Sequence, residues 1–385
     1  MRRLRFFVNR LLAFGALAGL AQACALVLGL EDKELGADVA DASSQDPPRP
    51  DGALPDGALP DVLVAPVFAG QQDRPIDVVV DSTHVYWINE GGQLRRKAKG
   101  AEATVETMAE GLATPRWISS DSRFVFWVAA NDPRSDAGRV TLVGRVAKDK
   151  SVAAQTLVDD NSQAYRQIAV FDGYPFAGDA SVDAAATPDN NVFTVFTYGN
   201  GNDDEIRAYG RVNGGLQYAF GRTPDGISAI VADDVNLYFA VRQGKALRRR
   251  AKGNTGTLPD TVTAFAEVVV DLATDQTHVY ALLVNGAVVR VPKVGAAGPE
   301  LVAQGKPGGQ RLTLDDTNVY FTSSVEGDAD GRVYAAPKRP GALTVLAGGQ
   351  RDPRGIAVES DPVTRARTVT VAVRGEGAVK RVLVP

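Results

Sequence analysis

The stretch Pro75–Gly100, PIDVVVDSTHVYWINEGGQLRRKAKG, constrains the fold most, because its pattern recurs along the 385-residue chain to the C-terminus. It reads as an apolar strand ending in Asp81, a tight turn, a strand around Tyr86, and a third strand after Gly91-Gly92. Repeats of roughly 40 to 50 residues with several short strands are typical of β-propellers, whose small sheets bury their faces only against neighbouring sheets. The sequence therefore predicts an all-β fold built from repeats.

Seven copies of the repeat can be aligned on their first strand, and six of these strands end in aspartate. The predicted inner strands are Ile76–Asp81, Trp117–Asp121, Gln167–Asp172, Ser228–Asp233, Val270–Asp275, Arg311–Asp315 and Gly355–Glu359. A short carboxylate at this point can accept hydrogen bonds from backbone amides two residues further on, so we expect an Asx-type turn. The second strands follow at 85–87, 125–127, 192–194, 237–239, 279–281, 319–321 and 369–371.

An arginine recurs in the predicted third strands, and an outer strand can be found for each repeat. The arginines are Arg96, Arg145, Arg211, Arg249, Arg290 and Arg381, with Ala335 in the remaining repeat. A residue repeated at one position in six blades indicates architecture rather than a binding site. Four strands in each of seven repeats predict a seven-bladed β-propeller of four-stranded blades.

The order of the strands predicts how the ring closes. The first outer strand, Leu63–Phe68, comes before the first inner strand, while the chain stops straight after a third strand around Val379–Val384. The N-terminal strand should therefore complete the last blade. Pairing between the two ends removes the sheet edges that an open array of blades would expose.

The N-terminal 61 residues have a different composition. Residues 1–23 carry four arginines followed by an apolar run, which is typical of a signal peptide, and Ala21-Gln22-Ala23 before Cys24 is similar to a bacterial lipobox. We therefore expect lipid on Cys24, although simple cleavage after Ala23 and an uncleaved membrane anchor are alternatives. Residues 24–61, rich in Asp, Pro, Ala and Gly, predict a disordered tether to a propeller at 62–385.

The motifs P-x-x-I-A-V-D, V-Y-W, a glycine turn and R-V-P-K resemble the repeats of the YWTD and NHL families of propellers. The resemblance covers about residues 62–385 and implies the propeller architecture. The chain also resembles exported bacterial proteins with such propellers. We therefore expect a lipoprotein of the bacterial cell envelope, on the periplasmic face or the outer membrane. Trp87 and Trp127 are followed by Ile88 and Val128 rather than by Thr-Asp, which departs from the YWTD pattern.

Composition excludes some classes of function. The net charge of −4 gives no general electrostatic basis for binding nucleic acid. The single cysteine allows no disulfide within the chain. We expect a monomeric binding or scaffolding protein that is held at a membrane by its N-terminal lipid and recognises a protein or a glycan, with no cofactor and no catalytic residues.

A metal-dependent hydrolase or lyase similar to the lactonase type is the alternative function. Asp77 and Asp271 occupy equivalent inner-strand positions and are the only pair that the sequence offers for a metal in the channel. His84 and His278 occupy equivalent turn positions, and other repeats have Phe124 or Asn236 at this position. We therefore interpret the two histidines as turn residues rather than as metal ligands.

Acidic residues gather in three segments predicted to be long loops between second and third strands. They are Asp132, Asp136, Asp203, Asp204, Glu205, Glu326, Asp328 and Asp330. Because such loops share one face of a propeller, these side chains should form an acidic rim that attracts cations or basic partners. Glu326, Asp328 and Asp330 also partly match a calcium loop, although a solvated hairpin turn is the simpler interpretation.

Overall fold

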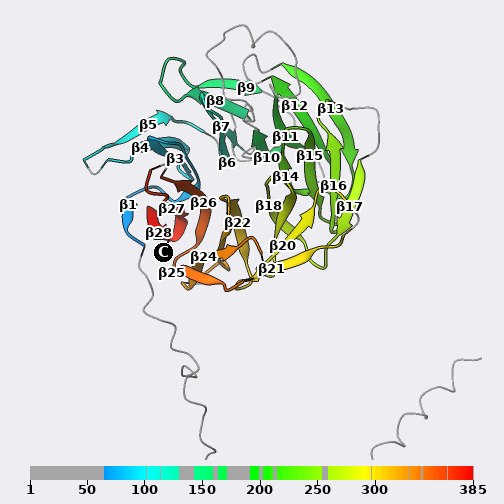
Figure 1. Cartoon of the computed structure of the whole chain (residues 1–385). Helices are drawn as coiled ribbons and strands as arrows, with labels where there is room; N and C mark the ends of the chain where they lie inside the picture. Colours follow the sequence, from blue (N-terminus) through cyan, green and yellow to red (C-terminus); the bar gives the residue numbers. More distant parts are fainter. Residues whose placement is uncertain are drawn as a thin grey trace, which may run out of the picture. The chain divides into compact units, whose positions relative to one another are not determined.

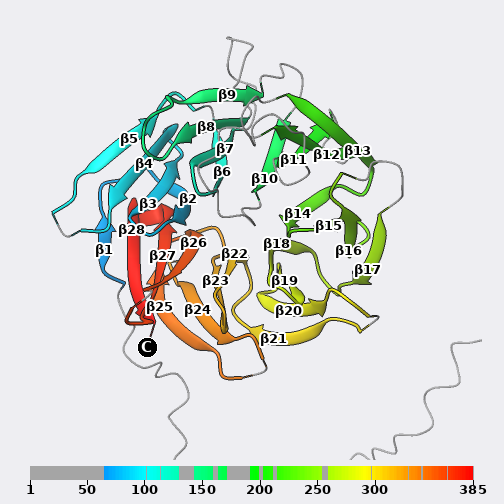
Figure 2. The same cartoon turned by 45° about the horizontal axis from the view of Figure 1, so that its top comes forward.

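Seven four-stranded antiparallel sheets are arranged in a ring in the structure, which is a computed structural model (Figures 1 and 2). The structure describes residues 65–384 apart from 101, 113, 130–142, 159–163, 171–190, 199–202, 211–214, 254–258, 296, 328, 340 and 362. The ring belongs to one compact unit, Leu59–Pro385. The prediction of a seven-bladed propeller is therefore confirmed.

Each blade contributes one strand to each of four concentric positions. The inner strands are β2 (Pro75–Val80), β6 (Pro115–Ser120), β10 (Ala164–Val170), β14 (Ile227–Ala232), β18 (Val269–Thr274), β22 (Gly309–Leu314) and β26 (Pro353–Ser360). The second strands are β3 (His84–Asn89), β7 (Phe124–Ala129), β11 (Asn191–Tyr198), β15 (Asn236–Val241), β19 (His278–Leu283), β23 (Asn318–Ser323) and β27 (Arg367–Val373). The third strands are β4 (Gln93–Ala98), β8 (Val143–Ala147), β12 (Asp203–Gly210), β16 (Ala246–Ala251), β20 (Ala287–Pro292), β24 (Gly331–Pro337) and β28 (Ala378–Val384). The outer strands are β5 (Val105–Ala109), β9 (Gln155–Val158), β13 (Leu216–Thr223), β17 (Asp260–Ala264), β21 (Glu300–Gln304), β25 (Thr344–Gln350) and β1 (Val67–Ala69).

The two ends of the chain complete one blade together, as the order of strands predicted. This sheet runs β1-β28-β27-β26, with Val67 opposite Lys380 and Ala69 opposite Val379. The amide of Arg381 also donates to the carbonyl of Pro66 at 3.0 Å. Figure 1 shows β1 and β28 side by side. The ring is therefore closed by hydrogen bonds between residues more than 300 positions apart in sequence.

Side chains of the second strands alternate between two neighbouring blades. In β3, Val85 and Trp87 pack against the last blade, in a cluster that includes Ala372. Tyr86 and Ile88 point the other way, into a cluster with Trp127 of the second blade. Because both faces of each sheet are covered, second strands are buried nearly throughout, which explains their aromatic and β-branched composition.

The recurring third-strand arginines lie opposite the centre of the second strand. Arg96 pairs with Tyr86, and Arg249, Arg290 and Arg381 have the same register. The third blade differs from the prediction, since Ala208 occupies this register opposite Phe193. Arg211, predicted for that place, follows the end of β12 and lies outside the described residues.

The described aspartates at the ends of inner strands make the predicted Asx turns, and several of them also join neighbouring blades, whereas Asp172 lies outside the described residues. Asp275 Oδ1 accepts hydrogen bonds from the amides of Thr277 at 2.9 Å and His278 at 2.8 Å. Its Oδ2 accepts from the Tyr280 hydroxyl at 3.0 Å and from Lys338 of the next blade at 2.9 Å. The same arrangement recurs with Asp81-Tyr86-Lys148, and with Asp315-Tyr320-Arg367.

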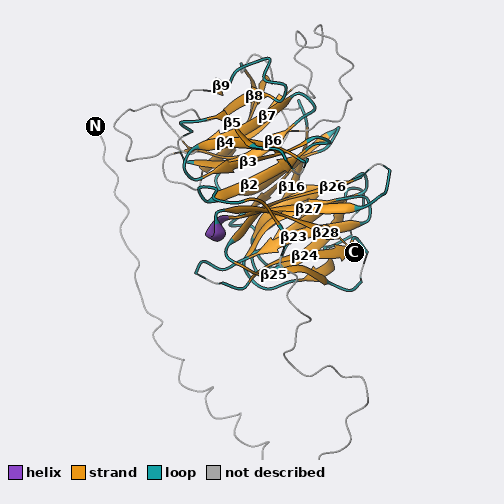
Figure 3. Ribbon diagram, turned by 90° about the vertical axis from the view of Figure 1, so that its left-hand side faces the viewer, coloured by secondary structure: helices purple, strands orange, loops and turns teal. Residues whose placement is uncertain are grey.

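The propeller has two faces, and the connections between strands are divided between them. Connections between second and third strands share a face with the segments before the inner strands, since Glu90 donates its amide to the carbonyl of Arg74 at 3.1 Å. The one-turn 3-10 helix Arg374–Glu376 lies on this face, and Figure 3 shows it opposite the C-terminal end of β28. In the described part of the chain, we find no helix of the length and apolarity needed to cross a membrane.

Candidate functional site

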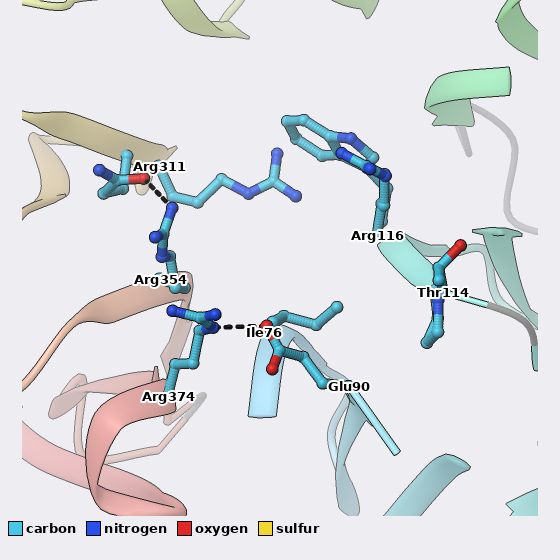
Figure 4. A pocket seen from close by; sticks show the side chains of 10 residues that line it. Ile76, Glu90, Thr114, Arg116, Arg311, Arg354 and Arg374 are labelled. Carbon is cyan, nitrogen blue, oxygen red and sulfur yellow. Dashed lines mark hydrogen bonds and ion pairs between the residues drawn. The ribbon is translucent and has the colours of Figure 1, made fainter. Parts of the chain in front are cut away.

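A pocket of about 570 Å³ lies where the inner strands begin, on the face that carries the connections between second and third strands. The starts of β2, β6, β22 and β26 line it, together with the β3–β4 turn and the 3-10 helix. Its charged lining residues are Glu90, Arg116, Arg311, Arg354 and Arg374. Figure 4 shows these side chains around one open space, with Arg116 across the pocket from Arg354 and Arg374. We call this site the arginine pocket.

Two of the arginines are held by one carboxylate. Asp352, just before β26, lies 2.7 Å from Nε of Arg354 and accepts from Nη1 of Arg374 at 2.6 Å. Nη1 of Arg354 also donates to Gln310 at 2.7 Å. Burial alone would raise the pKa of Asp352, but Arg374 and Arg354 outweigh burial and hold that pKa below its usual value. Asp352 therefore stays ionised and fixes both guanidinium groups.

A second carboxylate orders the other side of Arg374. Glu90, in the β3–β4 turn, accepts a hydrogen bond from Nε of Arg374 at 2.6 Å and forms an ion pair with Arg74 at 2.7 Å. Glu90 and Asp352 thus hold Arg374 from two blades, the first and the last. Such paired guanidinium groups are pre-organised, since their rotamers are already restricted before anything binds.

Arg116 differs from the other arginines because it makes no hydrogen bond or ion pair with any residue that the structure describes. It is the extra residue of a β-bulge between Pro115 and Trp117, both of which keep their pairing with β7. Its side chain is exposed and lines the pocket. All five of its N–H donors are therefore open to a ligand.

The floor of the pocket is made by Arg311 and Trp117. The Arg311 guanidinium lies 3.0 Å from the centre of the Trp117 ring, and its Nη2 donates to Asp77 Oδ2 at 2.6 Å. The same two residues line a second cavity of about 230 Å³ deeper in the channel. Arg311 and Trp117 therefore separate the arginine pocket from the rest of the channel.

Asp77 and Asp271, the predicted pair for a metal-dependent enzyme, join adjacent blades. Oδ2 of Asp77 accepts the amide of Ile118 at 3.0 Å, and Oδ2 of Asp271 accepts the amide of Leu312 at 2.9 Å. Burial raises the pKa of Asp271 to about 6, although Arg311, 3.9 Å away, opposes this shift. Both carboxylates are thus engaged with the amide of the next inner strand, which accounts for their equivalent positions.

Backbone strain marks the same side of the ring. Arg74, Thr114 and Asp352 have φ values of 52°, 38° and 53°, in the left-handed region that favours glycine. At the equivalent position before β14 and β22 the chain has Gly226 and Gly308. A non-glycine residue in this conformation costs of order 1 kcal/mol, and such residues cluster at functional sites. Two of the three have side chains that form the ion pairs of the pocket.

The predicted acidic rim is placed only in part. Asp132, Asp136 and Asp328 lie outside the described residues. The loop predicted to run to Glu205 is shorter, because β12 begins at Asp203. Asp204 is fully buried and accepts the amide of Ile227 at 2.6 Å, and Glu205 is nearly buried beside Arg207. Because consecutive side chains of a strand point to opposite faces, Asp204 and Glu205 are buried on the two sides of the sheet.

The predicted calcium loop contains an acidic side chain that is already paired. Asp330 forms ion pairs with Lys306 at 2.5 Å and with Arg332 at 3.1 Å, and these hydrogen bonds lower its pKa to about 2. Glu326 is exposed. Within the described ranges, no group of three or more His, Cys, Asp or Glu side chains is placed to hold a metal ion. His84 and His278 lie at equivalent turns, each with Nδ1 2.8 Å from the hydroxyl of the preceding threonine.

The sequence interpretation missed Arg116, Arg354 and Arg374. A signal for the first two was present, because Pro115-Arg116 and Pro353-Arg354 follow one pattern, proline then arginine, at the start of an inner strand. Other blades place Ile76 or Gln310 there. An arginine found at this position in only some blades cannot be required by the repeat. No comparable signal marks Arg374.

Comparison with known proteins identifies the fold and nothing finer. No protein-family model matches the chain, and no curated protein matches it. The WD40 β-propeller domain of Doa1 is 14% identical over 84% of this chain and 96% of that one, with a TM-score of 0.53. The computationally designed Ika8 protein is 11% identical over 84% and 99% of the two chains, with a TM-score of 0.52. A chain of the nidogen/laminin complex is 14% identical over 57% and 75%, with a TM-score of 0.41. The chain is therefore similar in fold to β-propellers that share little of its sequence.

Proposed function

We propose that this protein is an exported binding protein of the bacterial cell envelope, lipid-anchored through Cys24, whose propeller holds an anionic ligand in the arginine pocket. The observation that carries the proposal is the pocket itself, where four arginines and one glutamate are the charged lining residues. Guanidinium groups match carboxylate and phosphate geometry, and they bind these groups through two parallel hydrogen bonds. A cavity of this volume has the size typical of small-molecule sites.

The N-terminal segment supports the proposed location. A signal-like residue range 1–23, a single cysteine at the expected cleavage point, and a polar tether at 24–61 follow one another before the propeller. A single lipid chain gives only marginal membrane binding, so a tethered protein of this kind needs more than one chain on Cys24. The YWTD- or NHL-like repeats fit a protein whose propeller serves binding, and we take the protein to be a monomer.

The acidic loops fit the same proposal as a separate surface. In the sequence Asp132, Asp136 and Asp328 follow second strands, and we propose that they join the exposed Glu326 in an acidic rim on the face of the arginine pocket. Acidic groups around a basic centre would disfavour anions that approach off-centre and would attract a basic partner. No observation favours the lactonase-type alternative, since Asp77 and Asp271 bond to amides of adjacent blades.

A thermal-shift screen of the purified protein tests the anion proposal. The screen compares carboxylates and phosphate esters with neutral and cationic analogues of the same size. A ligand at 100 times its Kd stabilises the folded state by about 2.7 kcal/mol, which is readily measured. We expect the stabilising compounds to be anions, and we expect Arg116→Gln to abolish the stabilisation.

Arg339→Gln is the matched control, because Arg339 is exposed, makes no hydrogen bond or ion pair with described residues, and follows β24 on the opposite face. It removes the same charge and should leave the stabilisation unchanged. Stabilisation by neutral and cationic compounds alone, or equal loss in both variants, would overturn the proposal.

A further inference from the structure

The charges around the arginine pocket do not balance. Arg116, Arg354 and Arg374 line the walls, and Arg74 pairs with the lining Glu90. Among described residues these four guanidinium groups are paired with only two carboxylates, those of Glu90 and Asp352. The floor adds no positive charge, because Arg311 is paired with Asp77 and has Asp271 3.9 Å away. The walls therefore carry an excess of two positive charges.

The two unbalanced charges lie on different blades. On one side, the three arginines Arg74, Arg354 and Arg374 are paired with only two carboxylates, Glu90 and Asp352. One positive charge therefore stays unbalanced on that side. On the other side, Arg116 of β6 has no carboxylate at all. The inner strand β2 lies between β6 and β26 in the ring, and Figure 4 shows Arg116 facing the other two arginines across the pocket.

Free donors are present on both sides. Each guanidinium has five N–H groups. Arg354 donates one hydrogen bond to Asp352 and one to Gln310, and its buried Nε lies against Asp352, which leaves two N–H groups for a ligand. Arg116 has all five. The surface between these two places includes the apolar residues Ile76 and Pro115 in the wall and Trp117 in the floor.

We propose that the ligand of the arginine pocket is a small organic dianion whose two carboxylate-type groups are separated by an apolar spacer, one bound by Arg116 and the other by Arg354 with Arg374. This inference rests on the proposed function and specifies its ligand. The spacer packs on Ile76, Pro115 and Trp117, while the two charged ends neutralise the excess. A phosphate group carries both of its charges on one centre, so it can pair with the arginines on only one side of the pocket.

Isothermal titration calorimetry on the full chain tests the inference with α,ω-dicarboxylates from malonate to suberate. The key comparison is between the diacid that binds best and its monoamide, which keeps the skeleton and loses one charge. Hydrogen bonds in which one partner is ionised are roughly twice as strong as those between neutral groups. We therefore expect the monoamide to bind at least about tenfold more weakly, since 1.4 kcal/mol is a factor of ten.

The variant Arg116→Gln tests whether Arg116 is the residue that binds the second carboxylate. In this variant the diacid and the monoamide should bind with nearly equal affinity, whereas Arg339→Gln should keep the difference seen in the unaltered protein. Arg116→Lys restores the charge without the two-pronged donor, so it should recover only part of the difference.

The outcomes separate this inference from the proposed function. Equal binding of diacid and monoamide by the unaltered protein would refute the dianion and leave an anion site standing. Inorganic phosphate that binds more tightly than every diacid would refute the separated charges. Failure of every anion to bind would overturn the inference and the proposed function together.

Discussion

Replacing Asp275 with asparagine should weaken the contact between the fifth and sixth blades in a measurable way. Asp275 Oδ1 would remain as an acceptor for the turn amides of Thr277 and His278. At the Oδ2 position, an amide nitrogen would face two donors, the Tyr280 hydroxyl and the Lys338 ammonium, which now lie 3.0 and 2.9 Å away. The substitution therefore removes the bond between blades and leaves the turn intact.

The magnitude follows from the two bonds that are lost. A hydrogen bond to a charged group contributes about 1.5–3 kcal/mol and a neutral one about 0.5–1.5 kcal/mol. The side chains of Asp275 and Lys338 are 23% and 13% exposed, so water compensates for part of the loss. We expect the free energy of unfolding to fall by about 2 kcal/mol, which lowers Tm by about 3 °C for a domain of this size.

Denaturant unfolding of Asp275→Asn, Lys338→Met and the double variant measures this contact as a coupling energy, which we expect to be about 1–2 kcal/mol. Asp316→Asn is the control. Asp316 occupies the corresponding turn of the next blade, is exposed, and makes no hydrogen bond or ion pair with described residues. Its substitution should change stability by less than about 0.5 kcal/mol.

The effect of Asp275→Asn should depend on pH. Burial alone would raise the pKa of Asp275, but hydrogen bonds from Lys338, Thr277 and His278 outweigh burial and hold the pKa below its usual value. A carboxylate with a lowered folded-state pKa stabilises the protein above its unfolded pKa of about 3.9, and this stabilisation is lost as the pH falls toward the folded value. The difference from the unaltered protein should be full above about pH 5 and shrink below about pH 4. A pH-independent difference, or one no larger than that of Asp316→Asn, would refute the reasoning.

Three further predictions concern the ring and the anchor. A protein that starts at Gln71 lacks the closing strand and should unfold at lower temperature than one that starts at Asp61; equal thermal stability would show that closure contributes nothing. Gly355→Ala should destabilise the propeller by about 1–3 kcal/mol in denaturant unfolding, because the added methyl would lie 2.5 Å from the Cα of Asp77, and an unchanged midpoint would contradict this close packing. Cys24→Ser should release the protein from membrane pellets, whereas a variant that still pellets with its N-terminal peptide would indicate an uncleaved anchor.

The propeller could be predicted because its main determinants recur at fixed offsets in the sequence. Asp275 and Tyr280 are five residues apart, as are Asp81 and Tyr86, and both pairs hydrogen-bond within their own turn. Short-range contacts of this kind leave a visible pattern. The lysines from the next blade, Lys338 and Lys148, also recur in the repeat. The sequence shows their position, but it does not show that their partners are the aspartates of the preceding blade.

The arginine pocket could be predicted much less well, because its contacts join residues far apart in sequence. Arg311 and Asp77 are 234 residues apart, and Arg374 and Glu90 are 284 residues apart. Neither pair follows a repeat, so only the ring brings them together. The acidic residues 203–205 were wrongly predicted to lie in a loop, for a different reason. Consecutive polar residues are typical of loops, and the sequence does not show the partners that allow these residues to be buried in a strand.

The pairing of β1 with β28 also sets an order of events during synthesis. Val67 is made early, whereas its partner Lys380 lies more than 300 residues further along the chain and is made much later. Until then the last blade lacks its third strand, and the ring has two open edges that can pair with other chains. Contacts of such long sequence separation also slow folding, because the entropy of closing the loop must be overcome first. Until β28 has been made, the nascent chain therefore needs another means, such as a chaperone, of keeping those edges from pairing with other chains.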